Sequence, residues 1–282
     1  MLFRSRWADD STLLFLSPIR ATIQLCSVSL SGGPVRVITS GAHDLNAFSA
    51  AGGRVVAEMT TLGSPTELFD VNPSDGAMTR ITNTNAEIYE HIRMGKVEER
   101  WVETTDGKRM LVWVVLPPDF DPSKKYPALL YCQGGPQSVV SQFWSYRWNL
   151  QLMAAQGYVV VAPNRRGLPS FGQEWLDQIS GDYSGQNIRD YLSAIDDVSA
   201  EPWVDRDRLG CVGASYGGYS VFFLAGNHQK RFKAFIAHCG MFNFESMYGA
   251  TEELWFPNND LGGPYWSDSP VEIGRASCRE RV

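Results

Sequence analysis

The chain has 282 residues, of which 44% are hydrophobic and 20% charged, as in an ordinary folded protein and not in a disordered segment. The net charge of -6 argues against nucleic acid as a partner, because proteins that bind it usually show a concentrated basic face. The longest apolar runs have the length of strands, far short of the roughly 20 residues that cross a bilayer, so we expect no membrane span.

Residues 1–95 are rich in strand and turn signals. Short apolar or alternating runs cut by Gly, Pro, Asn and Asp predict antiparallel strands at 11–18, 22–30, 35–41, 54–61, 66–73 and 78–83. The first three runs match the last three at an offset of about 43 residues, the range of a four-stranded propeller blade. The repeat predicts a partial β-propeller of about two blades, with an antiparallel sandwich as the alternative. Because a closed propeller needs at least about four blades, we expect further blades upstream of Met1.

The pattern changes at Lys96. Two strands flank a turn and lead into a proline-rich linker, after which apolar strands alternate with helical segments. The strands are expected at 96–104, 108–116, 128–133, 158–164, 208–214 and 234–240, and the helices at 148–157, 188–200 and 217–227. Such alternation predicts a parallel sheet with helices on both faces. Residues 96–271 are therefore expected to form an α/β domain.

The segment GASYG at 213–217 fits the G-x-S-x-G nucleophile elbow of α/β hydrolases, with a strand before it and a helix after it. In such an elbow the Ser215 hydroxyl is exposed above the sheet, and the Tyr216 backbone N–H at the helix start points toward a developing oxyanion. The string also arises by chance in glycine-rich chains, but its context favours a nucleophile. We therefore predict an α/β-hydrolase domain with Ser215 as its catalytic residue.

A second loop with candidate chemistry, YCQGGPQS at 131–138, follows the first strand of the alternating series. An α/β hydrolase takes its second oxyanion donor from this loop. Gly134 N–H is the expected donor, and the side-chain amide of Gln133 could assist it. A plain Gly-Gly-Pro turn is the alternative.

The chain offers no convincing general base for Ser215. In α/β hydrolases the carboxylate and the histidine follow the serine in the sequence. His43 and His91 precede it, His228 lies on a polar stretch, and His238 ends the next strand, where a structural role is expected.

The last eleven residues, EIGRASCRERV at 272–282, are abruptly arginine-rich and have no apolar periodicity. They match the translation of a common short-read sequencing adapter. We therefore expect the native sequence to be recorded only to about Val271, with the α/β-hydrolase domain cut short before its last strands. The triad Asp and His are then encoded beyond this point.

The five cysteines are scattered and form no C-x-x-C pair, which excludes a disulfide scaffold and a zinc ribbon. Cys132, Cys211 and Cys239 lie in or at the end of apolar runs, so we expect all three to be buried. The sequence supports neither a metal nor an organic cofactor.

With strand-rich text followed by YCQGGPQS, APNRRGLPSFGQEW and GASYGGYS, the chain resembles the prolyl oligopeptidase family of serine peptidases over nearly its whole length to Val271. It is most similar to the dipeptidyl peptidase and acylaminoacyl peptidase branches, above all the bacterial dipeptidyl-peptidase V type. The resemblance implies an α/β-hydrolase domain capped by a β-propeller, with a Ser-Asp-His triad that cleaves short peptides near the N-terminus. Where other branches carry a tyrosine or a histidine before the two glycines, this chain has Gln133, which leaves the second oxyanion donor open.

The resemblance also implies a substrate pocket built partly from the aromatics of GMFNFESMYGATEELWF at 240–256, namely Phe242, Phe244, Tyr248 and Trp255. From the residues alone, these side chains could equally belong to the core. Oligopeptides are the implied substrates, a homo-oligomer is possible, and the location is implied to be periplasmic or secreted. An esterase of the same fold and a propeller-containing binding protein with an inactive hydrolase domain are the competing functions.

Overall fold

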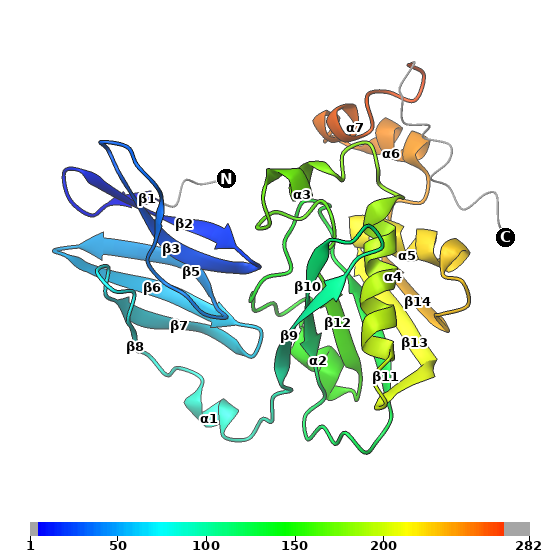
Figure 1. Ribbon diagram of the computed structural model, residues 1–282, viewed down its shortest axis with the longest axis horizontal. Helices are drawn as coiled ribbons and strands as arrows, with labels where there is room; N and C mark the ends of the chain where they lie inside the picture. Colours follow the sequence, from blue (N-terminus) through cyan, green and yellow to red (C-terminus); the bar gives the residue numbers. More distant parts are fainter. Residues whose placement is uncertain (1–4, 268–282) are drawn as a thin grey trace. The chain divides into compact units, whose positions relative to one another are not determined.

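The computed structural model describes residues 5–267, which form two units (Figure 1). The first unit contains the described residues up to Gly95 together with Ser141–Leu152. The second contains Lys96–Val140 and the described residues from Met153 onward. The tail at 272–282 lies outside the described residues.

The first unit holds one eight-stranded sheet. Its strands are β1 (Ser5–Trp7), β2 (Thr12–Ile19), β3 (Thr22–Ser29), β4 (Arg36–Val37), β5 (Asp44–Ala51), β6 (Arg54–Thr61), β7 (Ser64–Val71) and β8 (Met78–Arg80). Strands β1 to β4 pair antiparallel in chain order, and β5 to β8 do the same. Because β2, β3 and β4 begin the same number of residues before β6, β7 and β8, the two meanders repeat one four-stranded unit.

Leucine, valine and phenylalanine side chains from both meanders form the core of the first unit. The only pairing described between the meanders is parallel and joins Ile23 of β3 to Asp44 of β5. Asp44 is buried and also holds the returning segment, since it accepts hydrogen bonds from Ser141 Oγ at 2.5 Å and from Gln142 N at 3.2 Å. The short helix α1 (Ala86–Tyr89) follows the sheet.

The second unit is built on a six-stranded mixed sheet in the order β14-β13-β11-β12-β10-β9. Its strands are β9 (Val97–Glu103), β10 (Arg109–Val115), β11 (Tyr126–Cys132), β12 (Val159–Pro163), β13 (Val204–Ala214) and β14 (Ala234–His238). Strands β11 to β14 pair in parallel, whereas β10 is antiparallel to both β9 and β12. The expectation of a parallel sheet is therefore confirmed for β11 to β14, the strands that alternate with helices. The turn that contains Asp106 and Gly107 folds β10 back on β9 as an antiparallel pair.

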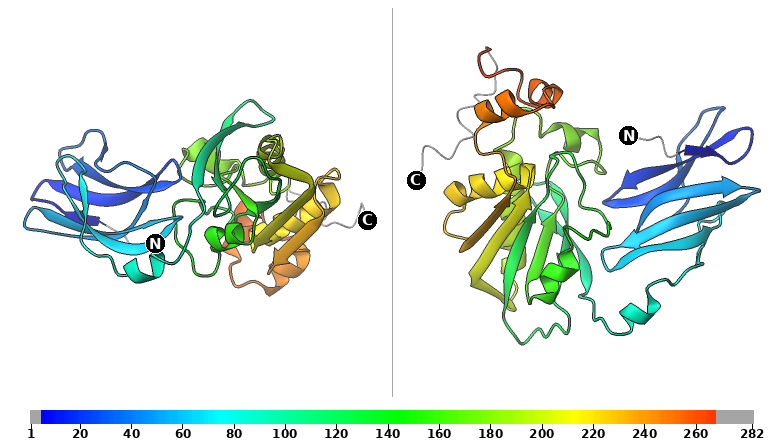
Figure 2. Two further views of the ribbon diagram at one scale, coloured as in Figure 1. Left: turned by 90° about the horizontal axis from the view of Figure 1, so that it is seen from below. Right: turned by 180° about the vertical axis from the view of Figure 1, so that it is seen from behind.

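Helices α4 (Gln186–Ser199) and α5 (Tyr216–Asn227) pack on this sheet, and α2 (Leu150–Ala155) precedes β12. Apolar residues of α4 and α5 share a buried cluster with alternate residues of the strands, among them Val112, Val114, Leu130 and Cys211. Three short helices, α3 (Gln173–Asp177), α6 (Phe244–Ala250) and α7 (Trp255–Asp260), lie together beyond one end of the sheet, as Figures 1 and 2 show.

Three cysteines of the second unit are predicted to be buried. Cys132 and Cys211 are buried as expected, but the prediction is wrong for Cys239, which is exposed. Cys239 directly follows β14, an edge strand of the sheet in which the Ile236 side chain is 56% exposed.

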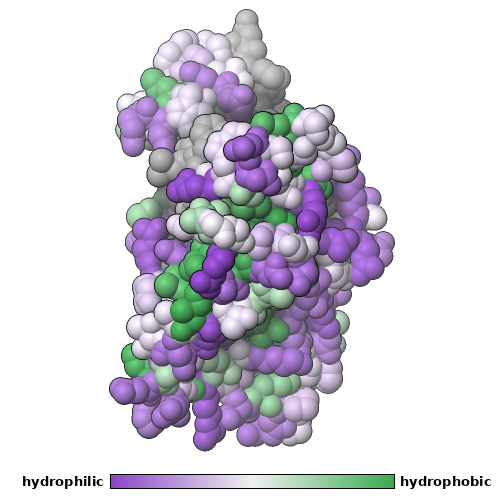
Figure 3. All heavy atoms as spheres, turned by 90° about the vertical axis from the view of Figure 1, so that its left-hand side faces the viewer, coloured by the Kyte–Doolittle hydropathy of each residue, from purple (hydrophilic) through white to green (hydrophobic). Residues whose placement is uncertain are grey.

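On the face shown in Figure 3, hydrophobic residues lie among mostly hydrophilic ones. Within residues 5–267, no helix has the length and apolar character that crossing a membrane requires.

Candidate active site

Ser215 occupies a sharp turn between the end of β13 and the start of α5. Its backbone has φ 57° and ψ -123°, a conformation that L residues rarely adopt and that costs about 1–3 kcal/mol. The turn is held by two hydrogen bonds, from Ser215 N to His238 O at 2.9 Å and from Tyr219 N to Ser215 O at 3.0 Å. Ser215 is exposed while its neighbours on α5 are buried. The strained elbow therefore presents the hydroxyl to solvent, as its sequence predicts.

The glycines around Ser215 are required for close backbone contacts. A Cβ on Gly217 would lie 2.0 Å from Cys132 O, and one on Gly218 would lie 2.7 Å from Gly240 Cα. A Cβ on Gly213 would lie 2.5 Å from Gly217 O. Helix α5 can thus begin directly against β11 and β14 only because these positions lack side chains.

The loop at 133–138 lies beside the elbow. A Cβ on Gly134 would be 2.9 Å from Ala214 O and 3.5 Å from Ser215 Cβ, so Gly134 and Ser215 are immediate neighbours. Neither Gly134 N–H nor Tyr216 N–H donates a hydrogen bond within the described chain. Two free backbone donors therefore lie next to one exposed hydroxyl, which is the arrangement that stabilises an oxyanion in acyl transfer.

The side chain of Gln133 faces the same loop. Its Nε2 donates to Ser138 Oγ at 3.1 Å, and its Oε1 is buried without a hydrogen-bond partner among the described residues. Rotating the amide by half a turn would let Ser138 donate to Oε1 and would free Nε2 as a donor.

Two adjacent arginines that the sequence did not single out, Arg165 and Arg166, are fully buried beneath these loops. Arg166 pairs with Asp106 at 2.6 Å and with the buried Asp190 at 3.4 Å. Its hydrogen bonds hold the pKa of Asp106 well below the usual range, whereas burial raises the pKa of Asp190 despite the arginine. Arg165 contacts the loop at 133–136 and stacks 4.7 Å from the centre of the Tyr216 ring.

The four predicted pocket aromatics do not share one environment. Phe244 is 4% exposed and packs in a buried cluster with Tyr183, Tyr216 and Tyr219. Phe242 is 50% exposed and contacts Phe222, with their ring centres 5.4 Å apart.

The other two predicted aromatics lie farther along the same segment. Trp255 is 66% exposed and packs on Phe256. Tyr248 contacts Tyr265 and Trp266, and its hydroxyl donates to Asn258 Oδ1 at 3.0 Å. Phe244 is thus a core residue behind the nucleophile helix, while Phe242 and Trp255 are accessible.

The buried carboxylate of Asp260 ties the aromatic segment to the loop at 133–138. It accepts hydrogen bonds from Gln137 Nε2 at 2.8 Å, Ser180 Oγ at 2.9 Å and Tyr183 OH at 2.7 Å. These partners lie 123, 80 and 77 residues away from Asp260 in the sequence. No local pattern in the sequence could have indicated this network.

His43, His228 and His238 lie in three different environments. His238 contributes its backbone carbonyl to the elbow. His228 Nδ1 accepts from Phe232 N at 3.1 Å, and burial lowers the pKa of its ring, helped by Arg231 and Lys233. His43 belongs to the first unit, where burial lowers its pKa.

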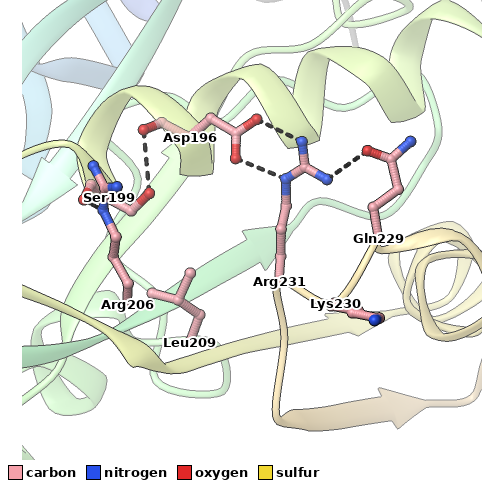
Figure 4. Close-up of a pocket in the computed structure, with 7 residues that line it drawn as sticks. All are labelled: Asp196, Ser199, Arg206, Leu209, Gln229, Lys230 and Arg231. Atoms are coloured by element: carbon pink, nitrogen blue, oxygen red, sulfur yellow. Dashed lines mark hydrogen bonds and ion pairs between the residues drawn. The ribbon is translucent and has the colours of Figure 1, made fainter.

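A surface pocket of about 370 Å³ lies at the opposite end of β13 from Ser215 (Figure 4). Asp196 and Arg231 form an ion pair there at 2.7 Å, and Arg206 Nε donates to Ser199 O. Through Arg231 and Arg206 the pocket joins the α5–β14 connection and β13 to α4.

The pattern that describes the prolyl oligopeptidase family matches residues 144–273. The chain is 55% identical over 271 residues to a dipeptidyl-peptidase 5 of Porphyromonas gingivalis, covering 96% of this chain and 40% of that protein. It is 48% identical over 264 residues to a dipeptidyl-peptidase 5 of Porphyromonas endodontalis, covering 94% of this chain and 38% of that protein. The chain therefore spans about two fifths of the length of these relatives.

Solved structures share the fold. An acylaminoacyl peptidase of Pyrococcus horikoshii superposes with a TM-score of 0.84 at 24% identity, over 98% of this chain and 44% of that protein. A Mycobacterium tuberculosis peptidase that hydrolyses puromycin superposes with a TM-score of 0.73 at 16% identity, over 98% of this chain and 51% of that protein.

Proposed function

Since the chain belongs to the prolyl oligopeptidase family, we propose that it carries the nucleophile of a serine peptidase that removes dipeptides or acylated residues from the N-terminus of short peptides. The observation that carries the proposal is the strained, exposed Ser215 beside the free N–H groups of Gly134 and Tyr216. Strain of this kind persists only where the surrounding structure enforces it, and it clusters at functional sites.

In the proposed reaction Ser215 Oγ forms a bond to the carbonyl carbon of the substrate, and its proton passes to a histidine. The N–H groups of Tyr216 and Gly134 donate to the oxyanion, with the Gln133 amide as a further donor. The C–N bond then breaks, and the amine leaves with that proton. Water hydrolyses the acyl-enzyme and regenerates Ser215.

The remaining parts of the machinery follow from the family. The histidine and its carboxylate partner come from parts of the whole protein outside this chain, and the first unit, with its repeated meander, is the end of a β-propeller that limits entry to short peptides. The accessible Phe242 and Trp255 supply apolar contacts to the substrate. The core residue Phe244 packs on the rings of Tyr183 and Tyr219, and Tyr248 fixes the segment that carries these aromatics.

The test uses the full-length protein and three chromogenic substrates: a dipeptidyl anilide with a free amine, an anilide of a single amino acid with an acetylated amine, and a short-chain nitrophenyl ester. A dipeptidyl peptidase hydrolyses the first, and an acylaminoacyl peptidase the second. The matched variant Ser215→Ala should hydrolyse none of them. Turnover of the ester alone would replace the proposal with an esterase, and no turnover at all would favour a binding protein.

A further inference from the structure

Arg165 lies between the loop at 133–136 and helix α5, with none of its surface exposed. Its Nη2 donates to Pro136 O at 3.1 Å and to Gln133 O at 3.4 Å, and its Nε donates to Tyr191 OH at 3.1 Å. Its Nη1 donates to Arg166 O at 2.7 Å. One guanidinium therefore holds both ends of the peptide segment that contains Gly134.

This buried charge has no carboxylate partner in the part of the chain that the structure describes. Arg166, the next residue, pairs with two aspartates, whereas Arg165 contacts only carbonyl and hydroxyl oxygens and the faces of two tyrosine rings. Burial alone would lower the pKa of Arg165, but Tyr191 and Tyr216 outweigh it and the pKa is raised, so the group stays charged. A buried charge without a counter-ion destabilises the folded state, so an arginine at this position needs a functional reason.

The geometry of the peptide group supplies that reason. The carbonyl of Gln133 and the N–H of Gly134 belong to one planar trans peptide, so they point in opposite directions. A cation that binds the oxygen therefore holds the N–H of Gly134, the immediate neighbour of Ser215, pointing away from the guanidinium. It also polarises the peptide, because hydrogen bonds in a chain strengthen one another. Tyr191 adds to this effect, since its hydroxyl also donates to Gln133 O at 3.4 Å. Burial raises the pKa of Tyr191 to about 12, so the hydroxyl keeps the proton that it donates.

We propose that Arg165 is a positioning residue for the oxyanion site: it clamps and polarises the Gln133–Gly134 peptide, and the oxyanion formed on the substrate is the negative charge that balances it. The inference rests on the proposed function. Arg165 then contributes positive potential to the oxyanion site, in addition to the hydrogen bonds that the two N–H donors supply.

The experiment compares Arg165→Met, Arg165→Lys and Tyr191→Phe in the full-length protein. Arg231→Met is the matched control, because it removes a guanidinium from the distant ion pair with Asp196 in the same unit. Each variant is measured with the substrate that the wild type hydrolyses, with the boronic acid analogue of that substrate, which forms a tetrahedral adduct with serine, and with the product of cleavage as a ground-state ligand.

For Arg165→Met we expect kcat to fall by about 100-fold, as when an oxyanion donor is removed, with KM within about threefold of the wild type. The boronic acid should lose affinity by the same factor, and the product should bind unchanged. Arg165→Lys keeps the charge but not the fork, so its loss should be smaller, about tenfold. Tyr191→Phe should show a smaller loss in the same direction. The control should match the wild type.

A folded Arg165→Met variant that binds the boronic acid as tightly as the wild type would overturn the inference, and so would equal losses of boronic acid and product affinity. If Arg165→Met does not fold, the same comparison in Arg165→Lys and Tyr191→Phe decides, since both keep the buried packing. A wild type that hydrolyses none of the substrates refutes the proposed function itself and the inference with it. An active wild type with unaffected variants refutes only the inference.

Discussion

Replacing Gly217 by alanine tests whether the nucleophile elbow is held by backbone contact. The new Cβ would lie 2.0 Å from Cys132 O. A normal contact requires about 1.4 Å more, and overpacking of this kind typically costs about 1–3 kcal/mol. Alanine normally stabilises a helix relative to glycine by about 1 kcal/mol, so the sign of the effect is diagnostic.

The same displacement should reach the chemistry. Cys132 is followed directly by Gln133 and Gly134, so moving its carbonyl by about 1 Å moves the oxyanion loop, and misplacement on that scale can lower kcat by about 100-fold. Thermal melting gives the stability, and turnover by the full-length protein gives kcat. The matched control is Gly226→Ala in the same helix, where the added Cβ meets nothing within 4 Å beyond its neighbours in the helix backbone. This variant should be neutral or stabilising and should keep full activity. A Gly217→Ala protein as stable and active as the control would refute the close-contact argument.

Three further changes test other parts of the structure. Ser215→Gly should abolish turnover yet raise the melting temperature, because glycine adopts the positive φ without strain and the folded state gains about 1 kcal/mol. Ser215→Ala should lose turnover with no such gain in stability. Equal melting temperatures of the two variants would contradict this expectation. Arg166→Met leaves Asp190 buried without a cation and should cost about 3–5 kcal/mol in urea denaturation, and an unchanged midpoint would show that the pair contributes nothing. Burial raises the pKa of Asp44 from 3.8 to about 6. The contribution of Asp44 to stability is therefore full below pH 4, and about 3 kcal/mol of it is lost as the pH rises through 6. Asp44→Asn should flatten the decline of the melting temperature between pH 4 and 7, and a parallel decline in both proteins would refute this assignment.

The sequence predicts what depends on local pattern. The elbow at Ser215 and the approach of Gly134 both follow from short motifs whose backbone requirements are strict, and helix α5 begins at Tyr216, where the motif places it. The repeated strand pattern of the first unit likewise appears as two matching meanders.

What the sequence missed is decided by distant partners. Strand β5, DLNAFSAA, is composed largely of residues with low strand propensity, and it forms because β6 pairs with it along its length. The network around Asp260 and the clamp formed by Arg165 join residues from separate loops. Cys239 was expected in the core because it follows an apolar run, but that run is an edge strand with one side open.

The most direct test of the account is to treat the full-length protein with a fluorophosphonate probe, digest it and locate the label by mass spectrometry. We expect one labelled peptide, modified at Ser215, and no labelling of the Ser215→Ala variant or of the heat-unfolded protein. A folded wild-type protein that stays unlabelled, or that carries the label on another serine, would contradict the assignment of Ser215 as the nucleophile.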